Sequence, residues 1–246
     1  MRRLLAAFVF VAAPILAAQA GSGDSILGVT VVQSKNGASL GVPMQIVLLL
    51  TALTMLPAIL MSVTPFLRSV VVLHFLRQAL GTQTTPSNQV LVGLALFVSL
   101  VVMQPVANEV YHKSWEPMEA GKISASDAWD LATPPIKTFL LKFAREKDIR
   151  LFVELSHSPQ PAKPEDVSMT ALVPAYVISE LKASFQIGAV LFLPFLIIDL
   201  VVASITLSVG MVQLPPVMVS APFKILLFVL VDGWNLVIGS LVKSFY

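Results

Sequence analysis

Long apolar runs separated by short polar breaks dominate this chain. Residues 44–63 form the first run, with no charge in twenty positions. Twenty residues at about 1.5 Å rise give a helix of roughly 30 Å, the thickness of a bilayer's hydrocarbon core. The other long runs are 89–106, 185–209 and 217–241. This pattern predicts several helices long enough to span a membrane.

Polar and proline-containing segments predict where these helices stop. The stretch 66–80 carries Arg68, His74 and Arg77 among valines and leucines and ends before Gly81. Pro57 and Pro65 predict a kink in or after the first run. The segment 210–216 begins with glycine and ends with two prolines. Such a segment is typical of a tight reversal, so the last two runs are expected to form a helical hairpin.

Residues 107–185 differ from the rest of the chain. They hold 20 of its 30 charged residues, 9 basic and 11 acidic. Pro134 and Pro135 are interpreted as breaks, and 137–155 as one amphipathic helix. We therefore expect a helical insert outside the membrane. The predicted domain plan is a signal peptide at 1–20, a polar arm at 21–43, a first helical hairpin region at 44–106, the insert at 107–185, and a C-terminal helical hairpin at 186–246.

The first twenty residues are typical of a secretory signal peptide. Arg2 and Arg3 precede a short apolar run, and Ala18-Gln19-Ala20 is a small-x-small triplet. Cleavage is expected after Ala20; the alternative is an uncut first membrane helix. The mature N-terminus is then outside the cytoplasm. Arg68 and Arg77 fall on the cytoplasmic side, as the positive-inside rule prefers, and the insert falls in the periplasm of a bacterial inner membrane.

Composition narrows the class of protein. Of the 246 residues 56% are hydrophobic and only 12% are charged, against about 25% charged in an ordinary soluble domain. This excludes intrinsic disorder and argues against a water-soluble enzyme. A net charge of +2 gives no basic footprint for nucleic acid. The sequence has no cysteine, no histidine pair at metal-binding spacing and no phosphate-binding glycine loop. Neither a cofactor nor a metal nor enzymatic chemistry is expected.

Charged residues inside the apolar runs are the most informative positions, because such residues usually face a partner or a water path. The midpoint between Asp199 and Lys224 falls at 211–212, the middle of the predicted reversal. Antiparallel helices would bring both to one depth, which predicts a salt bridge within one subunit or between neighbours. The alternative is that Asp199 caps or breaks a helix. Asp232, eight residues beyond Lys224, is a second candidate partner.

Two functional classes fit these features. An ion-coupled transporter could use Asp199, but a proton relay needs a chain of carboxylates or histidines, and these runs hold few. A passive gate needs a ring of flexible apolar side chains that closes the pore. Met211, Val212 and Gln213, at the tip of the reversal, are the candidate constriction.

Several strings resemble the FliP family of flagellar type III export-gate proteins. They are 75–83 (FLRQALGTQ), 88–97 (NQVLVGLALF), 173–182 (VPAYVISELK), 185–188 (FQIG), 193–199 (LPFLIID) and 222–234 (PFKILLFVLVDGW). The resemblance covers roughly 44–245. The secretory signal suits the flagellar branch; the equivalent subunit of a virulence injectisome is the alternative.

This resemblance implies an all-α integral membrane protein that is one subunit of a helical, pore-forming assembly in the flagellar basal body. It implies five copies of this chain, FliQ and FliR as partner subunits, other export-apparatus and basal-body ring proteins as neighbours, and unfolded export substrates. It also implies that the apolar runs pack in a cone raised largely above the membrane, which conflicts with the topology from hydropathy. The family's loop at 210–216 usually holds several methionines, whereas Val212 and Gln213 follow Met211 here. Asp199, Lys224 and Asp232 are implied to be charged packing positions.

Overall fold

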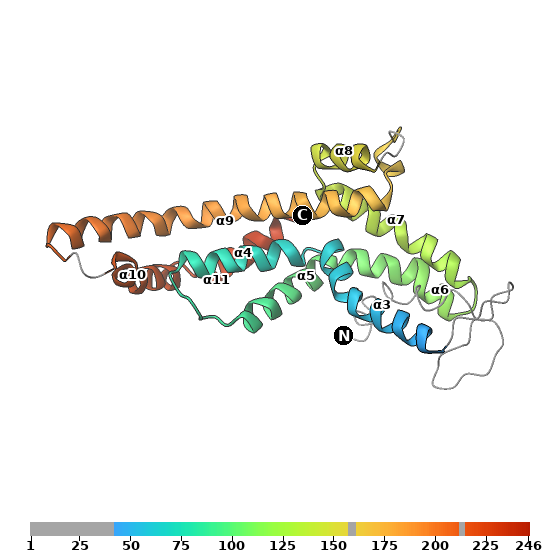
Figure 1. The fold of residues 1–246 in the computed structure, drawn as a ribbon, viewed down its shortest axis with the longest axis horizontal. Coiled ribbons are helices and arrows are strands. Elements are labelled where there is room, and N and C mark those ends of the chain that lie inside the picture. The colour runs from blue at the N-terminus through green and yellow to red at the C-terminus, as the bar shows by residue number, and fades with distance from the viewer. Residues whose placement is uncertain (1–41, 157–160, 212–214) are drawn as a thin grey trace. The chain divides into compact units, whose positions relative to one another are not determined.

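The computed structural model describes residues 42–156, 161–211 and 215–246, which are helical with connecting turns and contain no strand. This confirms the predicted all-α fold. The π-helical turn η1 covers Tyr111–Trp115 and the 3-10 turn η2 covers Pro164–Asp166. The α-helices (Figure 1) are α3 (Val42–Val63), α4 (Phe66–Ala79), α5 (Asn88–Val110), α6 (Glu116–Glu119), α7 (Ala125–Phe143), α8 (Glu146–Leu155), α9 (Met169–Ser208), α10 (Pro216–Leu230) and α11 (Gly233–Lys243).

These helices divide into two compact units. The first comprises the described residues of Met1–Val63, with Gln104–Lys142 and Pro161–Met169. The second comprises Thr64–Met103, the described residues of Phe143–Gln160, and those of Thr170–Tyr246. Both α5 and α7 contribute residues to each unit. The expected boundary between 185 and 186 falls inside α9, and the domain plan as a whole stays a prediction.

The first unit has a small core where α5 and η1 meet α7. Val110, Ala128 and Ala132 are buried there, with Trp115 packed against them. The buried Ser114 hydroxyl donates a hydrogen bond to the Ala128 carbonyl. The same unit contains α3, where only 6% of an 18-residue apolar window is buried.

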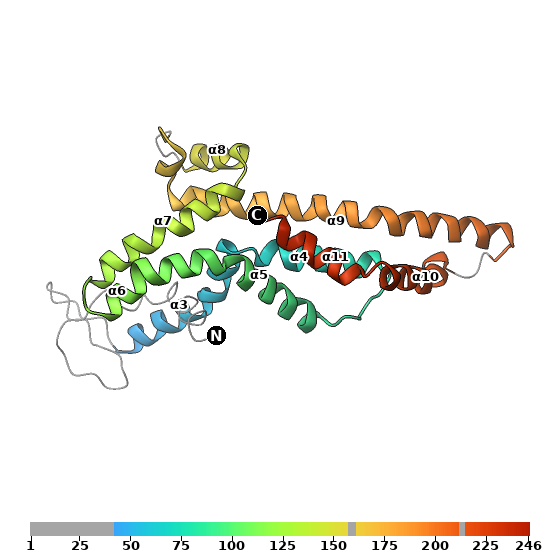
Figure 2. The same ribbon diagram turned by 180° about the vertical axis from the view of Figure 1, so that it is seen from behind.

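The second unit is organised around the 40-residue helix α9. Helix α4 lies along α9 in the same direction, since Arg68 contacts Glu180 and Phe75 contacts Gly188 seven or eight residues further along each helix. Figures 1 and 2 show this pairing from opposite sides. The apolar core between them includes Leu73, Leu76 and Phe195.

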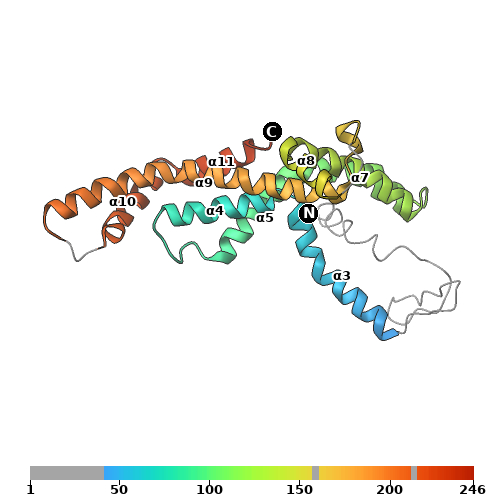
Figure 3. The same cartoon turned by 45° about the horizontal axis from the view of Figure 1, so that its top comes forward.

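Helix α10 returns antiparallel to α9. At the end of α9, Gly210 has φ +78°, a left-handed conformation that glycine adopts without a Cβ penalty. Its N–H bonds to the Leu207 carbonyl and that of Met211 to the Thr206 carbonyl, which closes the helix as a Schellman motif. Phe195 then packs on Phe228, with ring centroids 6.5 Å apart. Figure 3 shows α10 and α11 lying along α9.

A sharp bend separates α10 from α11. The two helices meet at 66°, and Asp232 at the bend has φ 52° and ψ 51°. Gly233 lies so close to Phe228 that a Cβ would be 2.2 Å from its ring. Trp234 packs edge-on against the same ring, with centroids 5.4 Å apart. The predicted continuous run 217–241 is therefore two helices.

Three other predictions about the helices were wrong. The expected single helix 137–155 is broken at Ala144 and Arg145, where Arg145 is extended with ψ 137°. Pro134 and Pro135 do not break the chain but lie inside α7. Last, α9 begins at Met169, well before the expected 185, and it includes Ser179 and Glu180, which are buried against α8 and α4.

Three of the described helical segments are long and apolar enough to cross a membrane, or four if the bent pair α10 and α11 counts as one. They are Ile46–Val63, Asn88–Glu119 and Met169–Ser208. Only 11% of the α9 window is buried within the chain. Lipid or other protein must therefore cover most of this apolar surface.

The contact between α4 and α9 can be tested at Gly188, where a Cβ would be 2.5 Å from the Phe75 ring. We expect Gly188→Val to lower the free energy of unfolding in detergent by about 1–3 kcal/mol through overpacking. Gly93→Ala in α5 is the control, because nothing lies within 4 Å of its Cβ position. Equal melting curves for both variants would contradict the close packing.

Candidate functional site

Two ion pairs hold carboxylates of the apolar helix α9. Glu180 pairs with Arg68 of α4, and Asp199 pairs with Lys224 of α10. The carboxylates are 19 residues apart in sequence, so about 28 Å separates them along the helix. Uncompensated charges are costly in apolar surroundings, and each pair therefore fixes which helix lies beside α9 at that level.

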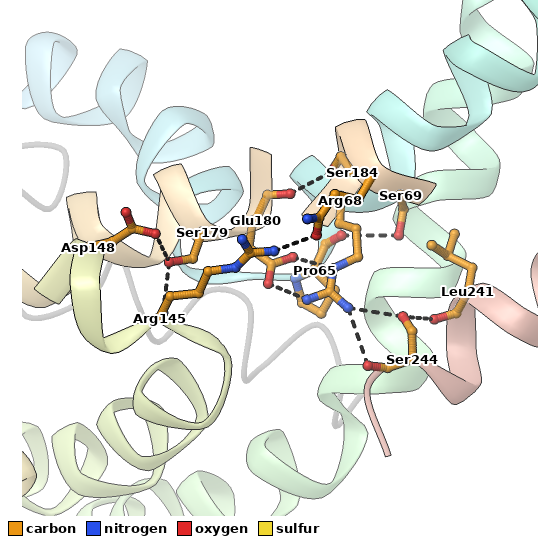
Figure 4. Close-up of polar contacts among 11 residues, drawn as sticks. Pro65, Arg68, Ser69, Arg145, Asp148, Ser179, Glu180, Ser184, Leu241 and Ser244 are labelled. Atoms are coloured by element: carbon orange, nitrogen blue, oxygen red, sulfur yellow. Dashed lines mark hydrogen bonds and ion pairs between the residues drawn. The ribbon is translucent and has the colours of Figure 1, made fainter. Parts of the chain in front are cut away.

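Arg68 and Glu180 form a two-pronged ion pair (Figure 4). Arg68 donates from Nε to Oε2 of Glu180 at 2.7 Å and from Nη2 to Oε1 at 2.5 Å. The Glu180 side chain is 0% exposed and that of Arg68 is 7% exposed. This parallel geometry is the strongest that an arginine and a carboxylate can make.

The remaining edge of Arg68 binds the residues that follow α11. Nη1 donates to the Ser244 hydroxyl at 3.0 Å and to its carbonyl at 3.3 Å. The guanidinium carbon lies 3.9 Å from the centre of the Phe245 ring and 5.5 Å from that of Phe143. One guanidinium thus joins α4, α9, the end of α7 and the residues after α11, through hydrogen bonds and cation–π contact.

The second pair is more open on one side. Lys224 Nζ lies 2.6 Å from Asp199 Oδ2, and Ser220 Oγ donates to Asp199 Oδ1 at 2.5 Å. The side chain of Lys224 is 3% exposed and that of Asp199 is 30% exposed. Gly81, just after α4, lies against this site, since a Cβ there would be 4.0 Å from Lys224 Nζ. The carbonyl end of the α4 dipole therefore also favours the ammonium charge.

Asp232 does not join the Lys224 pair. The helix ends before it, so the expected common helical face does not exist. Its carboxylate instead accepts a hydrogen bond from Asn235 Nδ2 at 3.1 Å. Asp232 is exposed. The structure thus brings together Asp199 and Lys224 and leaves Asp232 apart.

A polar seam next to Glu180 attaches α8 to α9 (Figure 4). The Arg145 backbone N–H donates to Ser179 Oγ at 2.8 Å, and that hydroxyl donates to Asp148 Oδ2 at 2.8 Å. Lys182 Nζ bonds to the other Asp148 oxygen. Burial raises the pKa of Asp148, but these hydrogen bonds and the charges of Lys182 and Arg145 outweigh it and leave the pKa below its usual 3.8. The seam therefore stabilises the fold at neutral pH, and that contribution is lost as pH falls through the lowered pKa.

The candidate constriction is only partly described. Met211 is 45% exposed at the end of α9. Val212 and Gln213 lie outside the described residues, as do Ala18 and Ala20 of the predicted cleavage site. The constriction and the cleavage site remain predictions.

Sequence reasoning missed the Arg68–Glu180 pair. Arg68 stood out within an apolar stretch, but Glu180 was assigned to the polar insert among ten other acidic residues. The string VPAYVISELK held the available signal, because Glu180 lies there among apolar residues at helical spacing. Across the described ranges, no group of three histidine, aspartate or glutamate side chains could hold a metal ion. The observed side chains are arranged to hold helices in register.

Apolar helices held by buried ion pairs are typical of an α-helical membrane-associated protein whose exposed apolar surface is covered by lipid or by other protein subunits. Comparison with known proteins gives the family. A model described as the FliP family matches residues 49–241. The chain belongs to the FliP family, as its sequence motifs predicted.

Three relatives carry the name flagellar biosynthetic protein FliP. That of Pectobacterium carotovorum is 50% identical over 210 residues, which cover 85% of this chain and 81% of the relative. That of Bacillus subtilis is 46% identical over 217 residues, covering 88% and 98%. That of Borreliella burgdorferi is 39% identical over 215 residues, covering 86% and 85%.

The energetic importance of the Arg68 pair can be measured with a double-mutant cycle. We expect Arg68→Met alone to lower the free energy of unfolding by about 3–5 kcal/mol, because it leaves Glu180 buried without a cation. Arg68→Met with Glu180→Gln should recover much of that loss. Arg150→Met with Glu146→Gln is the control, since that i,i+4 pair is exposed. Additive losses at Arg68 and Glu180 would show that the two side chains act independently.

Proposed function

We propose that this chain is a core pore-forming subunit of the flagellar type III export gate in the bacterial inner membrane, and that it conducts unfolded flagellar proteins. Membership in the FliP family over residues 49–241 carries the proposal. The flagellar names of the three relatives favour the flagellar system over a virulence injectisome.

The uncovered apolar surface supports a role inside a larger assembly. On α9, large apolar side chains are exposed at successive turns, including Leu193, Leu196, Leu200 and Ile205. On α10, Met218 and Leu230 are 73% and 74% exposed. Five copies of this chain with FliQ and FliR, as the family resemblance implies, would bury such surface between subunits.

The proposed function is tested by deleting the gene in a flagellated host. We expect secretion of hook and filament proteins and swimming to be lost while growth continues, and both to return when the chain is supplied on a plasmid. The control is complementation with the Arg150→Met variant, which changes only an exposed pair. Normal secretion in the deletion strain would contradict the proposal.

The loop after α9 is proposed as the seal of the pore. Replacing Met211, Val212 and Gln213 together by glycine removes the side chains that would close an idle pore. We expect ion leak through the assembled gate to rise in liposomes.

The matched control places three glycines in another connection, as Gln83→Gly, Thr84→Gly and Thr85→Gly. Both variants are first checked for assembly, so that a failure to assemble is not read as a change in the seal. Unchanged leak from an assembled loop variant would argue against this seal.

A further inference from the structure

The exposed face of α11 combines charges at its ends with small residues between them. Asp232 lies at the start and Lys243 at the end, and both are exposed. They are 11 residues apart, close to three helical turns, so they lie on one side of the helix about 16 Å from each other. Between them are Leu236, which is 58% exposed, the exposed Ser240, and Gly239. Nothing lies within 4 Å of a Cβ placed on Gly239.

This face is separate from the one that α11 uses inside the chain. Gly233, Val237 and Leu241 are its buried residues, and Val237 belongs to the core of the second unit. No ion pair forms at either Asp232 or Lys243 within the described parts of the chain, where Asp232 meets only the neutral amide of Asn235. The two charges thus remain for a partner outside these residues.

The position of Asp232 favours a cationic partner. It lies at the bend of the apolar α10–α11 pair, between Leu230 at 74% and Trp234 at 39% exposure. When protein or lipid covers these apolar side chains, the carboxylate is covered with them. A short aspartate cannot reach the membrane surface as lysine does, so a cation beside it would stabilise its charge.

We propose that this α11 face docks an apolar helix of a different membrane protein of the assembly. That helix carries an arginine or lysine opposite Asp232 and an acidic residue about eleven positions away, opposite Lys243. Gly239 and Ser240 allow close approach of the two backbones. The proposal rests on the proposed function only in requiring a multi-protein assembly.

The charges of the described residues favour a different chain over a second copy. Of the other ionic side chains on the long apolar helices, Arg68, Glu180, Asp199 and Lys224 are already paired within the chain. Arg77 of α4 is bonded to neutral groups, Asn88 Oδ1 and the Pro86 carbonyl, but α4 has no acidic residue that could face Lys243. Among the apolar helices of the described ranges, only α11 itself could offer both missing charges to a second copy, by packing antiparallel. Copies inserted in one direction in a membrane present α11 helices that run the same way, so this arrangement is excluded for them.

The proposal is tested with Asp232→Asn, Asp232→Lys, Lys243→Glu and the double variant Asp232→Lys with Lys243→Glu. Asparagine tolerates the left-handed backbone at this position, so Asp232→Asn removes the charge and keeps the fold. Tagged chain is purified from membranes that contain the whole export apparatus, and co-purifying membrane proteins are quantified. We expect Asp232→Asn to reduce one partner by about tenfold, and Asp232→Lys to remove it. Asn235→Ala, which removes only the intrachain hydrogen bond, should leave the partner bound.

Each further outcome decides between the occupants of this face. Restored assembly in the double variant would overturn the proposal in favour of a second copy. In an antiparallel pair of copies, position 232 of each faces position 243 of the other, so exchanging both charges keeps opposite charges facing each other. Wild-type levels of every partner in Asp232→Asn and Asp232→Lys would overturn it in favour of lipid or water at this face. An acidic substitution in another membrane subunit that restores swimming to Asp232→Lys would support it. Assembly is measured without secretion, so failure here is distinct from failure of the proposed export function.

Discussion

The need to neutralise carboxylates on an apolar helix governs the arrangement of the second unit. Glu180 and Asp199 are the two carboxylates that α9 places against its neighbours, and each is bound by a cation from a different helix. Apolar packing alone would allow two helices to pair in several registers, because apolar side chains make contacts of similar energy in each of them. A buried charge pair has only one good register. Arg68 therefore sets α4 against α9, and Lys224 sets α10 against α9.

The same reasoning links the core to the outer surface. Helix α11 is held at its end by Arg68 through Ser244 and Phe245, and at its start by the bend at Asp232 and the packing of Gly233 on Phe228. Once both ends are fixed, the face with Asp232 and Lys243 points outward in one defined direction. The pairs inside the chain thus determine which charges remain for partners.

Much of this arrangement could be predicted from sequence, and the failures have physical causes. The Asp199–Lys224 register followed from counting residues on either side of the reversal, because a short loop forces antiparallel helices into a fixed alignment. The helix break at Asp232 could not be predicted from the sequence, because aspartate indicates a left-handed backbone conformation much less strongly than glycine does. Pro134 and Pro135 were wrongly interpreted as helix breaks, because the tendency of proline to break a helix is overridden where packing supports the helix. Glu180 was missed because charge density along the chain does not show which side chain faces inward.

The central claim, that the Arg68–Glu180 pair sets the register of α4 on α9, can be tested directly, because the chain has no cysteine. At Gly188 a Cβ would be 2.7 Å from Phe75 Cγ, which puts the two Cβ positions within about 4 Å, as a disulfide requires. The measurement is the yield of disulfide in membranes after Phe75→Cys and Gly188→Cys are combined, with Phe75→Cys and Val201→Cys as the distant control. A high yield that falls when Arg68→Met is added, and returns when Arg68→Glu is combined with Glu180→Arg, is the predicted result. An equal yield with and without Arg68 would contradict the claim.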